Sequence, residues 1–304
     1  MKLLKQYLVN PVSPTAKDMR TYIKENSAVK LLRHCQMKHI SKSITLAVSL
    51  LVSVTAMALP KSNPVPGGLV VIDLQSESHN VPDATYLNRK VATVKENGKW
   101  YAIVGLSLKT KAGHQEIRMG GKGFSFNVSA KDYPEQHIKL KTRKHIDLSE
   151  ADLKRHRGEK KKAQAAFKFF DDNTAPDFAF LKPVEGPYSS PFGLKRFFNG
   201  EPRNPHSGLD IAAPTGTAIK APASGKVVLT GNFFFNGNVV YVDHGQGLIS
   251  MFCHLSEINV QKGDLLDKGR VLGKVGATGR VTGPHLHWSV SLNNSRIDPM
   301  LLLE

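Results

Sequence analysis

The sequence predicts a mainly β protein with a small N-terminal β domain, one connecting helix and a C-terminal antiparallel β domain. Three observations favour this fold class. Short strand-like runs fill residues 66–146, one long helical pattern follows Ser149, and Gly- and Val-rich segments with regular turn signals fill residues 178–304. With 304 residues, 40% of them hydrophobic, the chain is long enough to form two hydrophobic cores.

The N-terminal β domain is expected to follow an extended Pro- and Gly-rich linker. Five short runs in it have strand composition: 69–74, 91–95, 100–108, 124–128 and 137–140. Between the second and third of these runs lies Asn97-Gly98, a dipeptide that adopts positive φ easily and is typical of a tight turn. The sequence therefore predicts an antiparallel hairpin there. No residue pattern in this domain indicates chemistry.

A single helix is predicted to connect the two domains. Ser149 followed by Asp152 is typical of a helix N-terminus, and the basic, Ala-rich residues that follow extend the pattern to about Phe170. Six cations lie in this stretch: Lys154, Arg155, Arg157, Lys160, Lys161 and Lys162. They form either a solvated helix face or a contact surface for an anionic polymer. The polar run 171–176 then predicts a linker, so the helix and linker together occupy 149–176.

The formal net charge of the chain is +17, from 42 Lys and Arg against 25 Asp and Glu. Residues 1–58 hold nine of these cations and two of these acids, which leaves 33 against 23, or +10, for the remainder. Such an excess favours an anionic partner, although a solvated surface is also typical of Lys-rich proteins. No nucleic-acid-binding motif accompanies the charge, so no nucleic-acid partner is expected.

An apolar run at 43–59 indicates an export signal. It is shorter than the roughly 20 apolar residues of a membrane-spanning helix. It also ends in Ala56-Met57-Ala58, the small-x-small pattern that signal peptidase accepts. We therefore expect a signal peptide at 37–58 that is cleaved after Ala58, with an uncleaved anchor as the alternative. The protein would then be periplasmic or secreted and would meet the membrane only during export.

The signal is preceded by more residues than an export signal needs. Met37 opens a short basic segment with Lys38 and Lys42, which is an ordinary beginning for a signal peptide. Residues 1–36 are thus expected to be either untranslated or a cytoplasmic leader. Because Cys35 lies in this part, export would leave Cys253 without a partner for an intramolecular disulfide.

Three short clusters in the C-terminal domain hold potential metal ligands: His206-Ser207-Gly208-Leu209-Asp210, Phe252-Cys253-His254-Leu255 and Gly283-Pro284-His285-Leu286-His287-Trp288. Two imidazoles and one carboxylate suit a tetrahedral zinc ion with a fourth position for water. Residues two apart on a strand share a face, so His285 and His287 would point the same way. Each cluster alone is also typical of a surface or core histidine, but together they indicate a zinc site.

These clusters resemble the lysostaphin and LytM-type zinc endopeptidases of peptidase family M23. Three further segments carry the resemblance, which covers about residues 183–301: Ser190-Pro191-Phe192-Gly193, Asp243-His244-Gly245 and Thr278-Gly279. The resemblance implies a domain of the LytM or barrel-sandwich type at 178–304, with an N-terminal β module before it. It implies one zinc ion per chain, held by His206, Asp210 and His287, and a catalytic pair formed by His254 and His285.

The activity that the resemblance implies is hydrolysis of the peptide cross-links in bacterial peptidoglycan, by a protein expected to be monomeric. Some relatives have lost ligands and activate other wall hydrolases without turnover. All five positions are present here, which favours the enzyme. The segments 221–227 and 262–272 also resemble lipoyl and biotinyl carrier domains, but no hairpin with a modifiable Met-Lys-Met-type lysine lies between them.

The sequence departs from the family's pattern at two positions. Ser289 stands where an acidic residue is usual, and Phe252 stands where a tyrosine is usual. Both departures bear on the residues that orient the ligands or touch the substrate. Of the other candidate ligands, His244 is predicted to be a turn residue. Cys253 is expected to be buried, pointing away from His254 on a strand.

Overall fold

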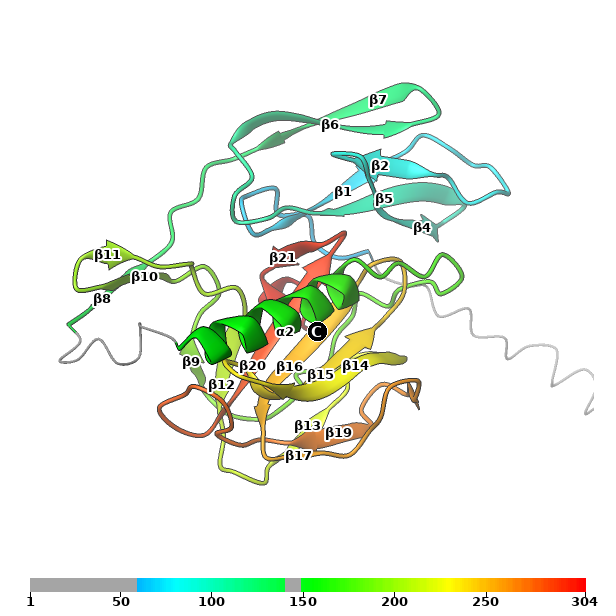
Figure 1. Cartoon of the computed structure of the whole chain (residues 1–304). Coiled ribbons are helices and arrows are strands. Elements are labelled where there is room, and N and C mark those ends of the chain that lie inside the picture. Colours follow the sequence, from blue (N-terminus) through cyan, green and yellow to red (C-terminus); the bar gives the residue numbers. More distant parts are fainter. Residues whose placement is uncertain (1–58, 140–148) are drawn as a thin grey trace, which may run out of the picture. The chain divides into compact units, whose positions relative to one another are not determined.

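A computed structural model describes residues 59–139 and 149–304 (Figure 1). The predicted signal peptide, its cleavage site, the leader and Cys35 lie outside the described residues. None of the helices within those two ranges is long and apolar enough to cross a membrane. The mainly β fold that the sequence predicts is confirmed, with an N-terminal β region, a central helix and a C-terminal antiparallel sheet.

The N-terminal β region contains two small sheets around an apolar core. The first sheet has the order β1 (Leu69–Asp73), β5 (Lys99–Gly105), β4 (Ala92–Glu96). The second has the order β3 (Arg89–Lys90), β2 (Ala84–Tyr86), β6 (Gly113–Met119), β7 (Lys122–Val128). The predicted hairpin is confirmed, because β4 and β5 pair in antiparallel fashion up to Glu96 and Lys99. Asn97 and Gly98 form the turn, with φ values of 49° and 82°.

The last strand predicted for this region forms, but its partner lies much later in the chain. Strand β8 (Glu135–Ile138) pairs in parallel with β10 (Lys195–Phe198), which in turn pairs with β11 (Glu201–Pro202). The ring of His137 stacks on that of Phe197 with 4.5 Å between their centroids. Local composition predicts a strand but carries no information about such a distant partner.

Helix α2 (Glu150–Phe167) connects the two regions and begins where the sequence predicts. The Ser149 hydroxyl accepts a hydrogen bond from the Asp152 backbone N–H at 3.1 Å, as an N-cap does. The helix ends at Phe167, three residues before the expected Phe170. There the Phe167 ring is buried against Tyr241, and the chain then leaves the helix.

An eight-stranded, largely antiparallel sheet dominates the C-terminal region. Its order is β18 (Leu265–Leu266), β14 (Gly225–Phe233), β15 (Gly237–Asp243), β16 (Ile249–Leu255), β20 (His285–Leu292), β12 (Leu209–Ala212), β9 (Tyr188–Ser190), with β21 (Ser295–Ile297) also paired to β20. A second sheet has the order β13 (Ala218–Lys220), β19 (Val271–Lys274), β17 (Glu257–Ile258). A short 3-10 helix, η1 (Pro299–Leu301), follows β21.

Alternating residues of the large sheet contribute to two different cores. Val240 and Val242 of β15 pack with Trp288 and Leu272 in the core shared with the second sheet. Tyr241 of the same strand belongs to a smaller cluster with Ala166 and Phe167 of α2, which lies across the sheet in Figure 1. This alternation is the period-2 pattern of a strand that is covered on both faces.

The N-terminal region contacts the C-terminal end of β20. The Asn293 side chain accepts a hydrogen bond from Gly105 N–H at 2.7 Å and donates one to Gly105 O at 3.1 Å. A Cβ atom at Gly105 would lie 2.7 Å from Leu292 O, so glycine permits this close approach. His285 and His287 lie at the opposite end of the same strand.

Candidate metal centre

Three predicted ligands converge where strands β12 and β20 meet. Asp210 and His287 are direct partners in the antiparallel pairing of these strands, and His206 precedes β12. His206 Nε2 lies 3.0 Å from His287 Nδ1 and 3.1 Å from Asp210 Oδ1. The distance between His287 Nδ1 and Asp210 Oδ1 is 2.7 Å. His206 and Asp210 are buried, and together the three side chains form a group that could hold a metal ion.

The donor set fits a small divalent cation. Ligand atoms at about 2.0–2.2 Å from a tetrahedral ion lie about 3.3 Å from one another, which is close to the separations in this group. Two ring nitrogens and one carboxylate oxygen face a common point, where their lone pairs repel unless a cation or a proton lies between them. A tetrahedral ion held by these three donors would keep a fourth position for water, as in open catalytic sites.

Hydrogen bonds outside the group orient both imidazoles. The outer nitrogen of His206, Nδ1, donates to Pro191 O at 2.9 Å. The outer nitrogen of His287, Nε2, donates to Ser289 Oγ at 3.0 Å, and the Ser289 hydroxyl donates to Ser207 O at 3.0 Å. With a metal bound, this network would keep the ring protons on the outer nitrogens and leave the inner lone pairs as ligands, whereas without a metal an inner ring proton can be donated to Asp210. Ser289 thus contacts His287 at the position where an acidic residue is usual.

Glycine is required beside this network. A Cβ atom at Gly208 would lie 2.6 Å from Ser289 Oγ and 2.7 Å from His287 Nε2. Ser289 is buried, His287 is half-buried, and the two are hydrogen-bonded to each other, so they have little freedom to move away. The glycine between His206 and Asp210 therefore allows the two segments to approach closely enough for all three ligands to meet.

The predicted catalytic pair lies beside the three ligands. His254 Nδ1 donates to Thr278 O at 2.9 Å, and His285 Nδ1 donates to Gly283 O at 2.9 Å. The two rings are 4.9 Å apart between centroids, and His285 Nε2 lies 3.9 Å from Asp210 Oδ1. Because both Nδ1 atoms are bound to backbone, Nε2 is the nitrogen that each ring can present to a substrate.

His254 has a backbone conformation that its sequence does not predict. Its φ is 66°, in the left-handed region that non-glycine residues rarely adopt. The backbone N–H of His254 donates to Asn236 O at 2.8 Å, which helps to hold this conformation. Strained backbone of this kind is common at functional sites, where the surroundings fix a side chain in one direction.

The charges of the group are set by burial and by the mutual hydrogen bonds. Burial raises the pKa of Asp210, but the hydrogen bonds with His206 and His287 outweigh it and hold that pKa below its ordinary value. Burial lowers the pKa of His287 more than Asp210 raises it. Burial also lowers the pKa of His254 to about 4, so this imidazole is neutral near pH 7.

One charged neighbour was missed by the sequence analysis. Arg196 of β10 places Nη2 3.9 Å from the second carboxylate oxygen of Asp210 and 3.0 Å from Ser190 Oγ. Its segment resembles any exposed basic strand, and only the tertiary fold brings it to the ligands. No local signal in the sequence identifies it.

His244 and Cys253 lie outside the ligand group. His244 follows β15, as predicted for a turn residue, but it is fully enclosed and contacts Ser224 O and Ser250 Oγ, each at 2.9 Å. Cys253 is a free buried thiol that accepts a hydrogen bond from Asn236, and burial raises its pKa to about 12. Phe252 is completely buried in the core.

Comparisons with known proteins identify the family. The chain matches the model "Peptidase family M23" over residues 204–299 and the model "Peptidase family M23 N-terminal domain" over residues 62–131. A Pseudomonas aeruginosa protein assigned to peptidase M23, known from a crystal structure, is 46% identical, with a TM-score of 0.68. The match covers 79% of this chain and 95% of that one.

Curated relatives such as the following two match over about a third of this chain. The peptidoglycan DD-endopeptidase ShyA of Vibrio cholerae is 41% identical over 96 residues, which are 32% of this chain and 22% of ShyA. The DD-carboxypeptidase/endopeptidase Mpg of Neisseria meningitidis is 38% identical over 112 residues, which are 37% of this chain and 26% of Mpg. The match thus spans about a quarter of each curated relative. The Pseudomonas structure, which matches over nearly its whole length, and the two family models together show that this chain belongs to peptidase family M23.

Proposed function

We propose that this protein is an exported zinc endopeptidase that hydrolyses the peptide cross-links of bacterial peptidoglycan. The observation that carries the proposal is the convergence of His206, Asp210 and His287, with two further imidazoles beside them. The names of the relatives support the substrate class, because ShyA is a peptidoglycan DD-endopeptidase and Mpg a DD-carboxypeptidase/endopeptidase.

One zinc ion would be held by His206 Nε2, Asp210 Oδ1 and His287 Nδ1. When bound, zinc lowers the pKa of a coordinated water to about 7 and polarises a carbonyl group. The carboxylate of Asp210 supplies the negative charge of the site, while Ser289 and Pro191 keep the two imidazoles in the orientation that presents their lone pairs.

His254 and His285 would move the protons of the reaction. His254 is neutral at pH 7 and has Nε2 available, so it can accept a proton from the attacking water. His285 is held through Nδ1 by Gly283, and in its imidazolium form it can also donate from Nε2 to the oxygen of the scissile carbonyl as negative charge develops there. The proton taken from water then passes to the leaving amine, so the chemistry requires no glutamate base.

The proposal includes export after cleavage behind Ala58, action as a monomer in the periplasm or outside the cell, and no nucleic-acid partner. The alternative is a wall-binding activator of other hydrolases without turnover of its own. The mature chain, loaded with zinc and incubated with purified sacculi, is expected to release soluble muropeptides that mass spectrometry identifies as products cut at the cross-links. Binding to sacculi without any release would favour the activator and contradict the endopeptidase.

A further inference from the structure

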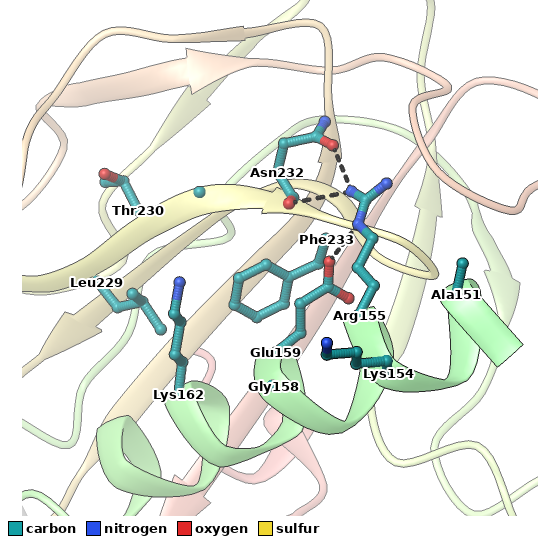
Figure 2. A pocket seen from close by; sticks show the side chains of 11 residues that line it. Ala151, Lys154, Arg155, Gly158, Glu159, Lys162, Leu229, Thr230, Asn232 and Phe233 are labelled. Atoms are coloured by element: carbon teal, nitrogen blue, oxygen red, sulfur yellow. Dashed lines mark hydrogen bonds and ion pairs between the residues drawn. The ribbon is translucent and has the colours of Figure 1, made fainter.

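A cleft of about 540 Å³ lies between helix α2 and strand β14 and contains none of the metal-centre residues (Figure 2). Lys154, Gly158 and Lys162 form one wall, because residues four apart lie in a row along a helix. Leu229 and Phe233 of β14 give the opposite wall an apolar surface.

Gly158 has no packing reason to be glycine. It lies in the middle of an 18-residue helix, where glycine is less favourable than alanine. A Cβ atom built there would meet nothing within 4 Å, whereas the Cβ positions of Gly208 and Gly237 collide with neighbouring atoms. The missing side chain at Gly158 therefore leaves open space between Lys154 and Lys162 into which another molecule could enter.

The cleft carries an excess of positive charge. Among the described residues, Lys154 and Lys162 form no ion pair, and both are exposed. Arg155 is fixed at one end by Glu159 Oε1 at 2.7 Å and Asn232 Oδ1 at 2.9 Å, as Figure 2 shows. Glu159 is the carboxylate of the lining, and it is already engaged by Arg155 and by the backbone N–H of Phe234.

Contacts connect the cleft to the metal centre through one turn of the chain. Glu159 Oε2 accepts a hydrogen bond from Phe234 N–H at 2.9 Å, and the ring of Phe235 packs against His156 of the same helix. The next residue, Asn236, accepts the backbone hydrogen bond of His254. A polymer held in the cleft would therefore lie close to the turn that supports a proposed catalytic histidine.

We propose that the cleft is a second binding site for the polymer that the enzyme cuts, and that Lys154 and Lys162 bind carboxylates of its peptide strands. The free carboxylates of wall peptides match the unpaired ammonium groups, and the apolar wall suits the aliphatic parts of the polymer. The identity of this ligand rests on the proposed function. The site would hold an uncut part of the polymer while another part reaches the metal centre.

The first test compares two pairs of lysines on one helix. Binding of the full mature chain to purified sacculi is measured by co-sedimentation after zinc removal, so that turnover plays no part. Lys154→Ala with Lys162→Ala should weaken binding about fivefold, as expected for two charge contacts of about 0.5 kcal/mol each. The control, Lys160→Ala with Lys161→Ala, removes the same charge outside the cleft lining and should bind like the wild type. Equal losses in both double variants would show that net charge alone acts, and would overturn the proposal.

A second variant fills the cleft without changing its charge. Gly158→Leu places a side chain in the open space, and leucine is a better helix former than glycine, so the fold should persist, as circular dichroism can check. We expect weaker binding to sacculi from Gly158→Leu and near wild-type binding from Gly158→Ala. Unchanged binding by the leucine variant would contradict a ligand that enters between the two lysines.

Chemical modification of the sacculi tests the carboxylates. Sacculi whose carboxylates have been converted to amides should bind the wild type as weakly as native sacculi bind the Lys154 and Lys162 double variant. Undiminished binding to amidated sacculi would overturn the proposal. So would lysine-dependent binding to phosphatidylglycerol vesicles with no binding to sacculi, which would indicate a membrane surface instead.

The two proposals can fail separately. If the zinc-loaded chain releases muropeptides but the cleft variants bind normally, the cleft proposal is wrong and the proposed function stands. If binding depends on the cleft but nothing is released, the second site stands and the endopeptidase does not.

Discussion

The two β regions of this chain enclose different kinds of residue. In the described part of the N-terminal region, Thr93 is the only buried polar side chain, and the core consists of residues such as Trp100, Ile117 and Phe124. The C-terminal region buries histidines, carboxylates and serines within or beside an equally apolar core. Among these are His206, Asp210, Asp243, His244, His254 and Ser289.

The buried side chains of the N-terminal region serve packing, whereas those of the C-terminal region include groups that are capable of chemistry. Burial of a polar group costs free energy unless the group is hydrogen-bonded or paired. The C-terminal region meets this requirement with a connected set of bonds that also aims ring nitrogens at one point. The described N-terminal region shows how the same chain builds a β core with a single buried polar side chain. Substitutions can test whether the buried polar groups of the C-terminal region have distinct roles.

The largest effect is expected from removal of the carboxylate ligand. Asp210→Ala should lose both zinc and muropeptide release, by more than about a hundredfold in metal affinity, because a change outside the ligand shell already costs 10- to 100-fold. Asp243→Asn is the matched control, since Asp243 is a buried carboxylate of the same sheet that lies outside the ligand group and bonds to Gly245 N–H. Full zinc occupancy in Asp210→Ala by elemental analysis would show that the ligand assignment is wrong.

The next largest effect is expected at the proposed catalytic pair, whose variants should lose turnover but, unlike variants of the proposed ligands, keep zinc. His254→Ala and His285→Ala should each lower turnover by about 10² to 10⁴ while retaining zinc, because their proposed role is proton transfer and charge stabilisation. His114→Ala, at an exposed histidine of the N-terminal region, should change neither property. Loss of zinc from either catalytic variant, together with retention in His287→Ala, would require the two roles to be exchanged.

The sequence predicted the fold and the grouping of the three proposed ligands better than it predicted the contacts that hold the site residues in place. The Asn97-Gly98 hairpin and the Ser149 cap follow from local chemistry, and the spacing of His206, Asp210 and His287 indicated a joint site. The left-handed backbone of His254 and the approach of Arg196 could not be predicted in this way. They depend on the packing of segments that are distant in sequence, as does the pairing of β8 with β10.

A buried histidine away from the ligands should make stability depend on pH. Burial lowers the pKa of His244 to about 4 from an ordinary value of 6.5, so the folded state keeps this imidazole neutral. Its contribution to stability is present above pH 6.5 and is lost as pH falls towards 4, amounting to about 3 kcal/mol. Denaturant unfolding of His244→Gln at several pH values should show a shallower decline over this range than the wild type.

The matched control for this pH dependence comes from the N-terminal region. His79 is exposed there, so His79→Gln should leave the difference in stability between pH 6.5 and pH 4 unchanged. If the stability of His244→Gln fell between pH 6.5 and pH 4 as much as that of the wild type, the acid sensitivity would belong to other groups.

The smallest effect concerns the departure from the family's pattern at Ser289. This hydroxyl accepts a hydrogen bond from His287 Nε2 and donates to Ser207 O, so it fixes the ring proton on the outer nitrogen. Ser289→Ala should weaken zinc affinity by about 10- to 100-fold, the usual cost of losing such a partner, while Ser289→Asp should restore affinity because a carboxylate accepts the same bond. Ser291→Ala is a strict control, since Ser291 is a completely buried serine on the same strand whose hydroxyl has no hydrogen-bond partner within the described residues. Zinc affinity measured by competition with a chelator should fall for Ser289→Ala only. An equal loss in both alanine variants would mean that burial of a hydroxyl in β20, and not its bond to His287, supports the metal.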